Sequence, residues 1–289
     1  MNSAPPTDLQ RLAAFSDGDQ GGNPAGVLIG ERLPEAPQMQ RIAAAVGDSE
    51  TVFAAPQGNG WRVRYFSPAA EVPFCGHATV ALGAALAERF GDGVFPLTIN
   101  QTQITVEGRR QGERWSAALQ SPPTHQGPVA PELLSAGLEL FGYEPSDLDP
   151  ALPAAIVHAG ADHLLLALRR REDLAAMRYA MEDGARLMAA AGLLTLLLVW
   201  AEGPQTFHSR NAFAAGGVYE DPATGSATAA LAGYLQSRGW PHGGSIAVVQ
   251  GEDMGCRSLL RAEIPPQAGA SIRVSGSVRR LPDPPALRH

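Results

Sequence analysis

The sequence predicts an α+β fold made of two similar halves, each a β-sheet wrapped around one buried helix. Three observations predict it: a segment that recurs at half the chain length, an Ala/Leu-rich helix in each copy, and many short β-rich segments around both. Of the 289 residues, 45% are hydrophobic and 18% are charged. This composition is typical of a globular chain of one or two domains and excludes disorder, collagen and coiled coil.

The recurring segment is the main evidence for two halves. Residues 71–89 (EVPFCGHATVALGAALAER) match residues 220–238 (EDPATGSATAALAGYLQSR) without a gap, and nine of the nineteen positions are identical. Chance similarity between two Ala-rich helices is the alternative, but the shared frame Glu-x-Pro-x-x-Gly-x-Ala-Thr does not follow from composition. We therefore expect domains at residues 1–121 and 126–289, with the last strands able to pair with the first half.

Each copy of the repeat predicts a strand end, a tight turn and a helix start. A proline disfavours an earlier helix start, and a glycine permits the turn. The helices expected at residues 78–89 and 227–238 carry little polar surface until their last turn, so both should be buried. Small residues inside them allow strands to approach closely: Gly83, Ala84, Ala232 and Gly233.

Other elements follow from local patterns. Helical spacing of apolar residues predicts helices at Glu35–Val46 and near Asp173–Ala191, and the Pro/Gly-rich segment Ser121–Pro128 is the expected linker. Strands are expected at residues 61–67, 103–107, 156–158, 164–168, 193–200, 246–250, 259–264 and 271–278.

Composition also excludes several functions. All 22 basic residues are arginine, so a lysine Schiff base and a Walker-type phosphate loop are excluded. The net charge of −7 and the scattered arginines argue against nucleic acid as a partner. Two cysteines are too few for a disulfide scaffold, and no segment has the length or apolarity of a leader or a membrane span. We expect a cytoplasmic protein.

The two helix starts are the candidate site. If the halves are related by an approximate twofold axis, the two turns face each other across a cleft. Backbone N–H groups near Gly76 and Gly225 would then hold a small carboxylate, because helix N-termini favour anions. The turns also carry reactive side chains that suit proton transfer to and from carbon: Cys75, His77, Asp221, Thr224 and Ser226. Taken singly, each of these residues could instead be an ordinary helix cap or core residue.

Five sequence blocks resemble the phenazine biosynthesis PhzF-like family, which shares the diaminopimelate epimerase fold. The blocks run from about residue 11 to about residue 279: GGNPAGV at 21–27, DSETVF at 48–53, RYFSPAAEVPFCGHAT at 64–79, EDPATGSATAAL at 220–231 and QGEDMG at 250–255. The resemblance implies two pseudo-symmetric domains, each a β-barrel-like sheet around a central helix. It further implies a homodimer and cofactor-free isomerisation, typified by the isomerase acting on trans-2,3-dihydro-3-hydroxyanthranilate.

Site residues carried over by the family motifs are Glu50, His77, Asp221 and Ser226. Glu50 is the implied acid/base, which moves a proton between carbons of a small carboxylic acid. The chain departs from the pattern in its fifth block, where Met254-Gly255-Cys256-Arg257 replaces Met-Gly-Arg and leaves the role of the arginine open.

Three alternatives stay open. Epimerases of this fold use two facing cysteines, but the counterpart of Cys75 is Thr224, which argues against a two-thiol racemase and leaves a one-thiol epimerase using Cys75. A second alternative is a small-acid-binding protein without turnover. The weakest is a zinc site at Cys75 and His77, because no third ligand stands at a recognisable spacing; we expect no metal.

Overall fold

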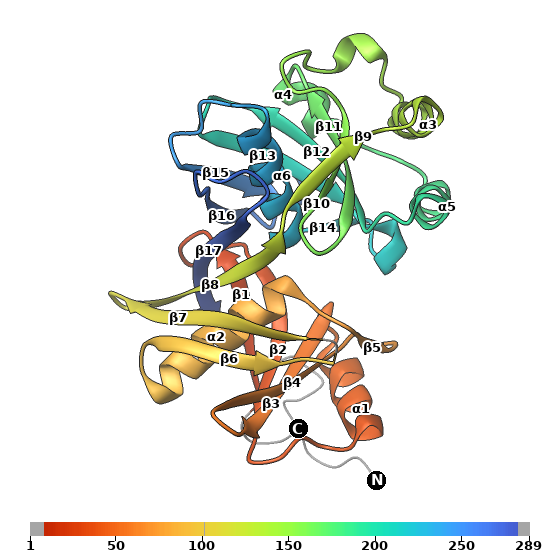
Figure 1. The fold of residues 1–289 in the computed structure, drawn as a ribbon. Coiled ribbons are helices and arrows are strands. Elements are labelled where there is room, and N and C mark those ends of the chain that lie inside the picture. The colour runs from red at the N-terminus through yellow and green to blue at the C-terminus, as the bar shows by residue number, and fades with distance from the viewer. Residues whose placement is uncertain (1–8, 101, 283–289) are drawn as a thin grey trace. The chain divides into compact units, whose positions relative to one another are not determined.

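The computed structural model describes residues 9–100 and 102–282 (Figure 1). In this part of the chain, strands and helices form two compact units. The first unit contains the described residues up to Gln120 and those from Ser275 onward, and the second contains Ser121–Val274.

The strands of the first unit pair into a closed ring. In order around the ring the strands are β1, β2, β3, β4, β6, β7, β8 and β17, which pairs with β1 again. The short strand β5 pairs with the end of β4. The bounds are β1 Leu9–Ser16, β2 Asn23–Ile29, β3 Glu50–Gln57, β4 Gly60–Phe66, β5 Glu71–Val72, β6 Gly93–Thr98, β7 Gln103–Gln111, β8 Arg114–Pro123 and β17 Ser271–Arg280.

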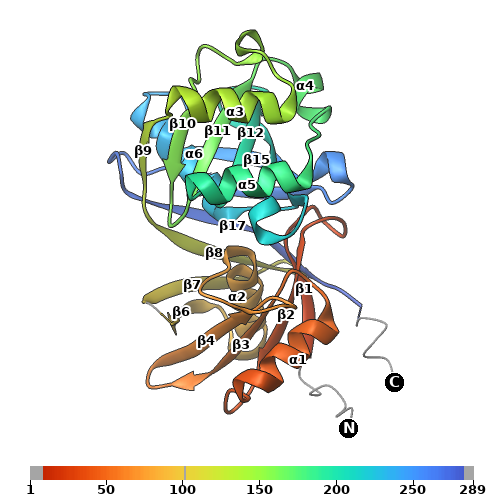
Figure 2. The same cartoon turned by 90° about the vertical axis from the view of Figure 1, so that its right-hand side faces the viewer.

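Helix α2 (Gly76–Phe90) lies inside this ring and contacts β1, β2, β3, β6 and β7 (Figures 1 and 2). Every residue from His77 to Ala87 is buried. A Cβ atom on Gly83 would lie 2.5 Å from Val106 Cγ2, and one on Gly108 would overlap the carbonyl oxygen of Gly83. Only glycine allows helix and strand to approach this closely, which confirms the expected role of Gly83.

Helix α1 (Ala36–Val46) packs against β3 and β4 through Met39 and Ala43, close to where a helix was expected. Pro37 stands in its first turn, where the missing N–H has no intrahelical acceptor. The helix ends at Gly47, whose φ of 74° lies in the left-handed region that glycine adopts without strain.

The second unit is a sheet with helices on both faces. Its strands pair in the order β9, β10, β11, β12, β13, β15 and β16, and β14 pairs with the end of β13. Helix α6 (Gly225–Ser237) covers one face, and α3 (Pro131–Phe141) and α5 (Met181–Ala191) cover the other (Figure 2). The bounds are β9 His125–Pro128, β10 Ala155–His158, β11 Asp162–Leu168, β12 Thr195–Ala201, β13 Thr206–Ala212, β14 Glu220–Asp221, β15 Ser245–Gln250 and β16 Ser258–Glu263.

Alternation of side chains explains why both faces of this sheet are covered. Leu164, Leu166 and Leu168 of β11 belong to the core under α3 and α5. Leu165 is fully buried as well, and it points to the opposite face because successive strand residues alternate. The predicted fold class, with a sheet and a buried helix in each half, is thus confirmed.

The helix expected near Asp173–Ala191 is interrupted. Helix α4 (Arg171–Ala175) ends early, and α5 begins only at Met181. Between them the backbone N–H of Tyr179 donates to Tyr219 Oη at 2.9 Å, and the two rings stack with centroids 4.5 Å apart. The expectation of one helix was wrong because this tertiary contact takes the N–H group that a continuous helix would use.

The segment Ser121–Pro128, expected to be a linker, is mostly strand. It forms the end of β8 and all of β9. Ser121 Oγ accepts a hydrogen bond from the Ile272 N–H at 2.9 Å, and the Thr124 N–H donates to the Gly269 carbonyl at 3.1 Å.

Within residues 9–100 and 102–282, every helix is too short or too polar to cross a bilayer.

His163 of β11 is a fully buried histidine in the core of the second unit. Its Nδ1 lies 2.7 Å from Thr195 Oγ1, and that hydroxyl donates to Asn211 Oδ1 at 2.9 Å. Nδ1 must therefore donate to the hydroxyl. Burial disfavours the charged imidazolium and lowers the pKa of His163 to about 3.

We expect His163 to make the protein less stable as the pH falls below about 6.5, the ordinary histidine pKa. The unfolded chain then binds a proton that the native chain does not, which costs about 1.4 kcal/mol per pH unit. Urea denaturation at pH 7, 6 and 5 should show a shallower pH dependence for His163→Leu than for the unchanged protein. Equal slopes would contradict a neutral buried imidazole.

Candidate active site

Glu50, Cys75 and His77 converge in the first unit. Cys75 Sγ lies 3.5 Å from Glu50 Oε2 and 3.4 Å from His77 Nδ1, and His77 Nε2 lies 3.3 Å from Glu50 Oε2. Cys75 is 9% exposed, His77 is 6% exposed and the Glu50 side chain is 14% exposed. The thiol, the imidazole and the carboxylate therefore form one mostly buried group.

The strand and helix starts position this group. Glu50 is the first residue of β3, Cys75 is the N-cap of α2, and His77 lies in the first turn of that helix. Thr79 Oγ1 donates to the Cys75 carbonyl at 2.7 Å, so the Tyr65 hydroxyl, also at 2.7 Å, must donate to Thr79. This chain of hydrogen bonds fixes the turn that carries Cys75.

One arrangement of protons satisfies all three groups. With the imidazole proton on Nε2, His77 donates to Glu50 or to Ser49 Oγ, which lies at 3.2 Å. The free Nδ1 can then accept from the Cys75 thiol, whose single proton can otherwise be donated directly to Glu50 Oε2. Thiol and carboxylate are thereby connected through one imidazole, an arrangement suited to proton transfer at carbon.

The same group offers three metal donors. One ligand atom from each of Glu50, Cys75 and His77 lies within 4.8 Å of the others. The folded chain thus supplies Glu50 as the third donor that the sequence spacing did not reveal. Carboxylate, thiolate and imidazole are all zinc ligands, so these residues are chemically able to bind zinc as well as to move protons.

Asp221 and Thr224 form the equivalent turn in the second unit. Thr224 Oγ1 donates to Asp221 Oδ2 at 2.5 Å. Gln250, which is fully buried, holds this turn from the end of β15: its amide donates to the Asp221 carbonyl at 2.7 Å and its Oε1 accepts from the Thr224 N–H at 3.1 Å. Gln250 was not among the expected site residues, although it begins the block QGEDMG.

The two turns have the same local structure. Helix α2 begins at Gly76 after the extended residue Cys75, and α6 begins at Gly225 after the extended residue Thr224. The first N–H groups of such helices have no intrahelical acceptor. Gly76, Gly225 and Ser226 thus lie where backbone donors are available in each unit.

An arginine pairs with the first glutamate of each repeat. In the first unit Arg64 Nε and Nη2 donate to Glu71 at 2.8 and 2.5 Å, and in the second Arg210 Nε and Nη2 donate to Glu220 at 3.0 and 2.5 Å. In each unit the glutamate faces one residue of the neighbouring strand. The arginine lies on that strand, two residues before the facing residue. The duplication therefore includes these ion pairs, which the sequence comparison did not reveal because the intervening loops differ in length.

The fifth block lies beside acidic and basic groups of the second unit. Arg257 Nε is 3.3 Å from Glu252 Oε1, and Arg171 pairs with Glu252 and Asp253 at 3.0 and 2.9 Å. Arg257 stands one position later than the family pattern places its arginine. It thus contacts Glu252, a carboxylate of the same block.

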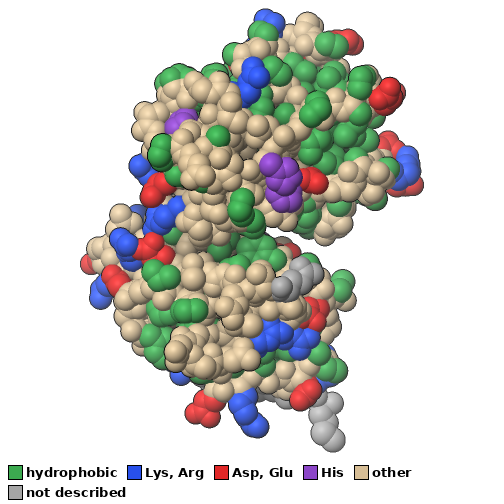
Figure 3. Space-filling view, in the orientation of Figure 1, with side chains coloured by type: hydrophobic (Ala, Val, Ile, Leu, Met, Phe, Trp, Pro, Cys, Tyr) green, Lys and Arg blue, Asp and Glu red, His purple; other side chains and the backbone are tan. Residues whose placement is uncertain are grey.

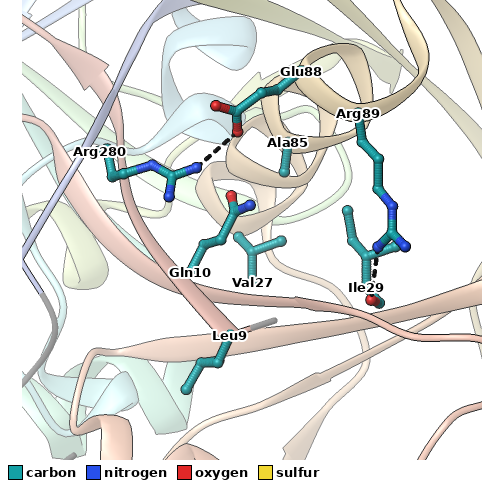
Figure 4. A pocket seen from close by; sticks show the side chains of 8 residues that line it. All are labelled: Leu9, Gln10, Val27, Ile29, Ala85, Glu88, Arg89 and Arg280. Carbon is teal, nitrogen blue, oxygen red and sulfur yellow. Dashed lines mark hydrogen bonds and ion pairs between the residues drawn. The ribbon is translucent and has the colours of Figure 1, made fainter. Parts of the chain in front are cut away.

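A pocket of about 320 Å³ lies elsewhere in the first unit (Figure 4). Its charged side chains are already engaged: Arg280 pairs with Glu88 at 3.0 Å, and Arg89 donates to the Ile29 carbonyl at 3.2 Å. We place the candidate active site at Glu50, Cys75 and His77 instead, since none of these residues lines the pocket. The lining residues are Leu9, Gln10, Val27, Ile29, Ala85, Glu88, Arg89 and Arg280.

Comparison with known proteins gives the family. Residues 12–278 match the PhzC-PhzF family, described as phenazine biosynthesis-like protein. The chain belongs to this family. A trans-2,3-dihydro-3-hydroxyanthranilate isomerase of Pseudomonas aeruginosa is 31% identical to it over 273 residues, which cover 92% of this chain and 94% of the relative. An uncharacterized isomerase of Deinococcus radiodurans is 31% identical over 279 residues, covering 91% of this chain and 88% of the relative.

Solved structures of PhzF-family proteins share this fold. A PhzF-family phenazine biosynthesis protein of Bacillus anthracis superposes with a TM-score of 0.83 at 21% identity, covering 95% of this chain and 96% of its own. A probable proline racemase of Agrobacterium radiobacter superposes with a TM-score of 0.64 at 10% identity, covering 94% and 90%. These likenesses show the fold, while the family match and the relatives named as isomerases establish the family and its isomerase character, as the sequence blocks indicated.

We expect Arg210 to be essential for the stability of the second unit. Arg210 and Glu220 are 6% and 5% exposed, and Arg210 Nη1 also donates to backbone carbonyls, including that of Ala175 at 2.9 Å. Arg210→Met leaves a buried carboxylate without this partner and should cost about 3 to 5 kcal/mol of unfolding free energy. Chemical denaturation measures this loss.

The repeat provides a matched control. The Arg64 and Glu71 side chains are 23% and 29% exposed, so solvent screens their pair. Arg64→Met should therefore cost no more than about 1 kcal/mol. Equal losses of unfolding free energy in Arg210→Met and Arg64→Met would contradict the expectation that burial determines how strongly such a pair affects stability.

Proposed function

We propose that this protein is a cofactor-independent isomerase that moves a proton between carbons of a small carboxylic acid, with Glu50 as the acid/base. The observation that supports it best is the contact of the Glu50 carboxylate with both His77 and Cys75 at the start of a buried helix. Membership of a family that includes a named isomerase of a carboxylic acid supports the reaction class.

The proposed chemistry is a balanced proton shift. The Glu50 carboxylate removes a proton from one carbon of the substrate, and the electron pair of that C–H bond enters the conjugated system. The resulting carboxylic acid returns a proton to another carbon, so the enzyme is regenerated and nothing is oxidised or reduced. His77, 3.3 Å from Glu50, would orient the carboxylate or relay its proton.

We assign the remaining roles by unit. In the first, the backbone at Gly76 and the thiol of Cys75 would bind the substrate. In the second, Asp221 would orient or protonate polar groups of the substrate, and Gly225, Ser226 and Thr224 would bind its carboxylate. Support comes from the free N–H groups at each helix start and from the Thr224–Asp221 hydrogen bond.

Glu50→Gln should lose about 10²- to 10⁴-fold in kcat, the usual contribution of a positioned acid or base. The amide cannot accept the substrate proton, and the loss corresponds to about 3 to 5 kcal/mol of barrier. The measurement is entry of deuterium from heavy water into a panel of unsaturated and α-substituted acids, starting with trans-2,3-dihydro-3-hydroxyanthranilate.

Glu113→Gln is the control for this experiment, because it changes an exposed glutamate of the same unit. The Glu113→Gln variant should incorporate deuterium at the rate of the unchanged protein. Prolonged treatment of the unchanged protein with a chelator should also leave its activity intact. Full activity in Glu50→Gln would remove Glu50 from the mechanism. Tight binding of an acid without any label exchange would instead favour a binding protein without turnover.

A one-thiol epimerase is the second candidate, because the Cys75 thiol contacts both Glu50 and His77. Cys75→Ala separates the two reactions. If Glu50 alone moves the proton, the alanine variant should keep its rate within about tenfold, less than the usual contribution of an acid or base. If Cys75 moves it, exchange with inversion at one stereocentre should disappear.

We further propose that the protein acts as a homodimer in the cytoplasm, without nucleic acid or membrane as a partner. The family resemblance supports the dimer. The net charge of −7 argues against nucleic acid as a partner. Light scattering of the purified chain measures its mass in solution.

A further inference from the structure

Two histidines and one aspartate form a cluster in the second unit that the proposed reaction does not use. His125 is the first residue of β9, His158 is the last of β10, and Asp162 is the first of β11. The antiparallel register places His125 directly opposite His158, and His158 directly opposite Asp162. Residues opposite each other point to the same face of a sheet, so the three side chains form one row across three strands.

The side chains in this row are in contact. The imidazole rings of His125 and His158 stack with centroids 4.1 Å apart at 25°, and His158 Nδ1 lies 2.7 Å from Asp162 Oδ1. One donor atom from each residue lies within 4.8 Å of the others. Donors of a tetrahedral zinc ion lie about 3.3 Å apart when its bonds are about 2.0 Å long. For one ion to bind all three donors, their spacing would have to shorten, and the stacked rings would have to turn until one nitrogen lone pair of each points to the ion.

The position of the cluster favours an ion that keeps contact with water. His125 is exposed, and the side chains of His158 and Asp162 are 25% and 45% exposed. His158 Nδ1 and Asp162 Oδ1 are thus in contact at a partly exposed position, and Figure 3 shows histidine and acidic side chains at the surface of the molecule. The side chains can thus move without repacking a core.

We propose that His125, His158 and Asp162 form a zinc site, with a fourth position left for water. Two imidazoles and one carboxylate are a zinc-type donor set, whereas magnesium and calcium prefer oxygen ligands. The bound ion would connect β9 to the β10–β11 hairpin and hold the first strand of the second unit to its sheet. This site is independent of the proposed isomerase chemistry.

The test must separate this cluster from the one at Cys75. We therefore use the full chain without a histidine tag and with Cys75→Ala in every sample. Equilibrium dialysis should find one equivalent of zinc, and Co²⁺ should give the visible absorption of a tetrahedral site without a thiolate charge-transfer band. In this background, zinc affinity should fall at least about tenfold with His158→Gln and with Asp162→Asn, because losing a direct ligand should cost no less than losing an outer-shell partner.

His208→Gln is the matched control. His208 also lies beside carboxylates of the second unit, at 3.4 Å from Glu202 and 3.2 Å from Glu252, but its ring has no second histidine stacked on it in the described part of the chain. This variant should bind zinc as before. Circular dichroism checks that the variants are folded. The proposal is overturned if the Cys75→Ala protein binds no zinc, or if folded His158→Gln and Asp162→Asn bind it unchanged.

Discussion

The first unit depends on one constraint: its central helix is surrounded by strands and must be narrow. Eleven consecutive residues of α2 are buried. A ring of strands can close around a helix only where the side chains between them are small, which is why Gly83 and Gly108 touch backbone to backbone. In the second unit Gly233 of α6 packs against the side chain of Thr124, which a Cβ at this position would overlap.

This constraint also locates the reactive groups. The interior of a sheet-wrapped helix is apolar, so the polar chemistry collects where the helix begins and its N–H groups are free. Glu50 reaches that end from the start of β3, Cys75 is the residue that precedes the helix, and His77 lies in its first turn. The second unit repeats the plan, with Gln250 holding the turn that precedes α6.

The duplicated halves differ in the burial of an ion pair that both contain. Both keep an arginine paired with the first glutamate of the repeat, but the Arg64–Glu71 pair is partly solvated and the Arg210–Glu220 pair is almost fully buried. A buried pair is sensitive to loss of one partner, whereas a solvated pair contributes little. The same two residue types therefore have different structural importance in the two halves.

The sequence by itself determined the two-part α+β fold, the central helices and the family, because the repeat and the Ala/Leu runs are local patterns that specify burial. It also named Glu50, Cys75 and His77, but Glu50 came from the family blocks and not from spacing. The tertiary structure alone decided that these three groups touch, that Gln250 holds the second turn and Arg210 pairs with Glu220 beside it, and that two tyrosines interrupt the helix near residue 179. It also brought His125 and His158 together. Most of these contacts join residues 25 to 40 positions apart, and the packing of distant strands and loops, which the pattern of a single segment does not specify, brings such residues together.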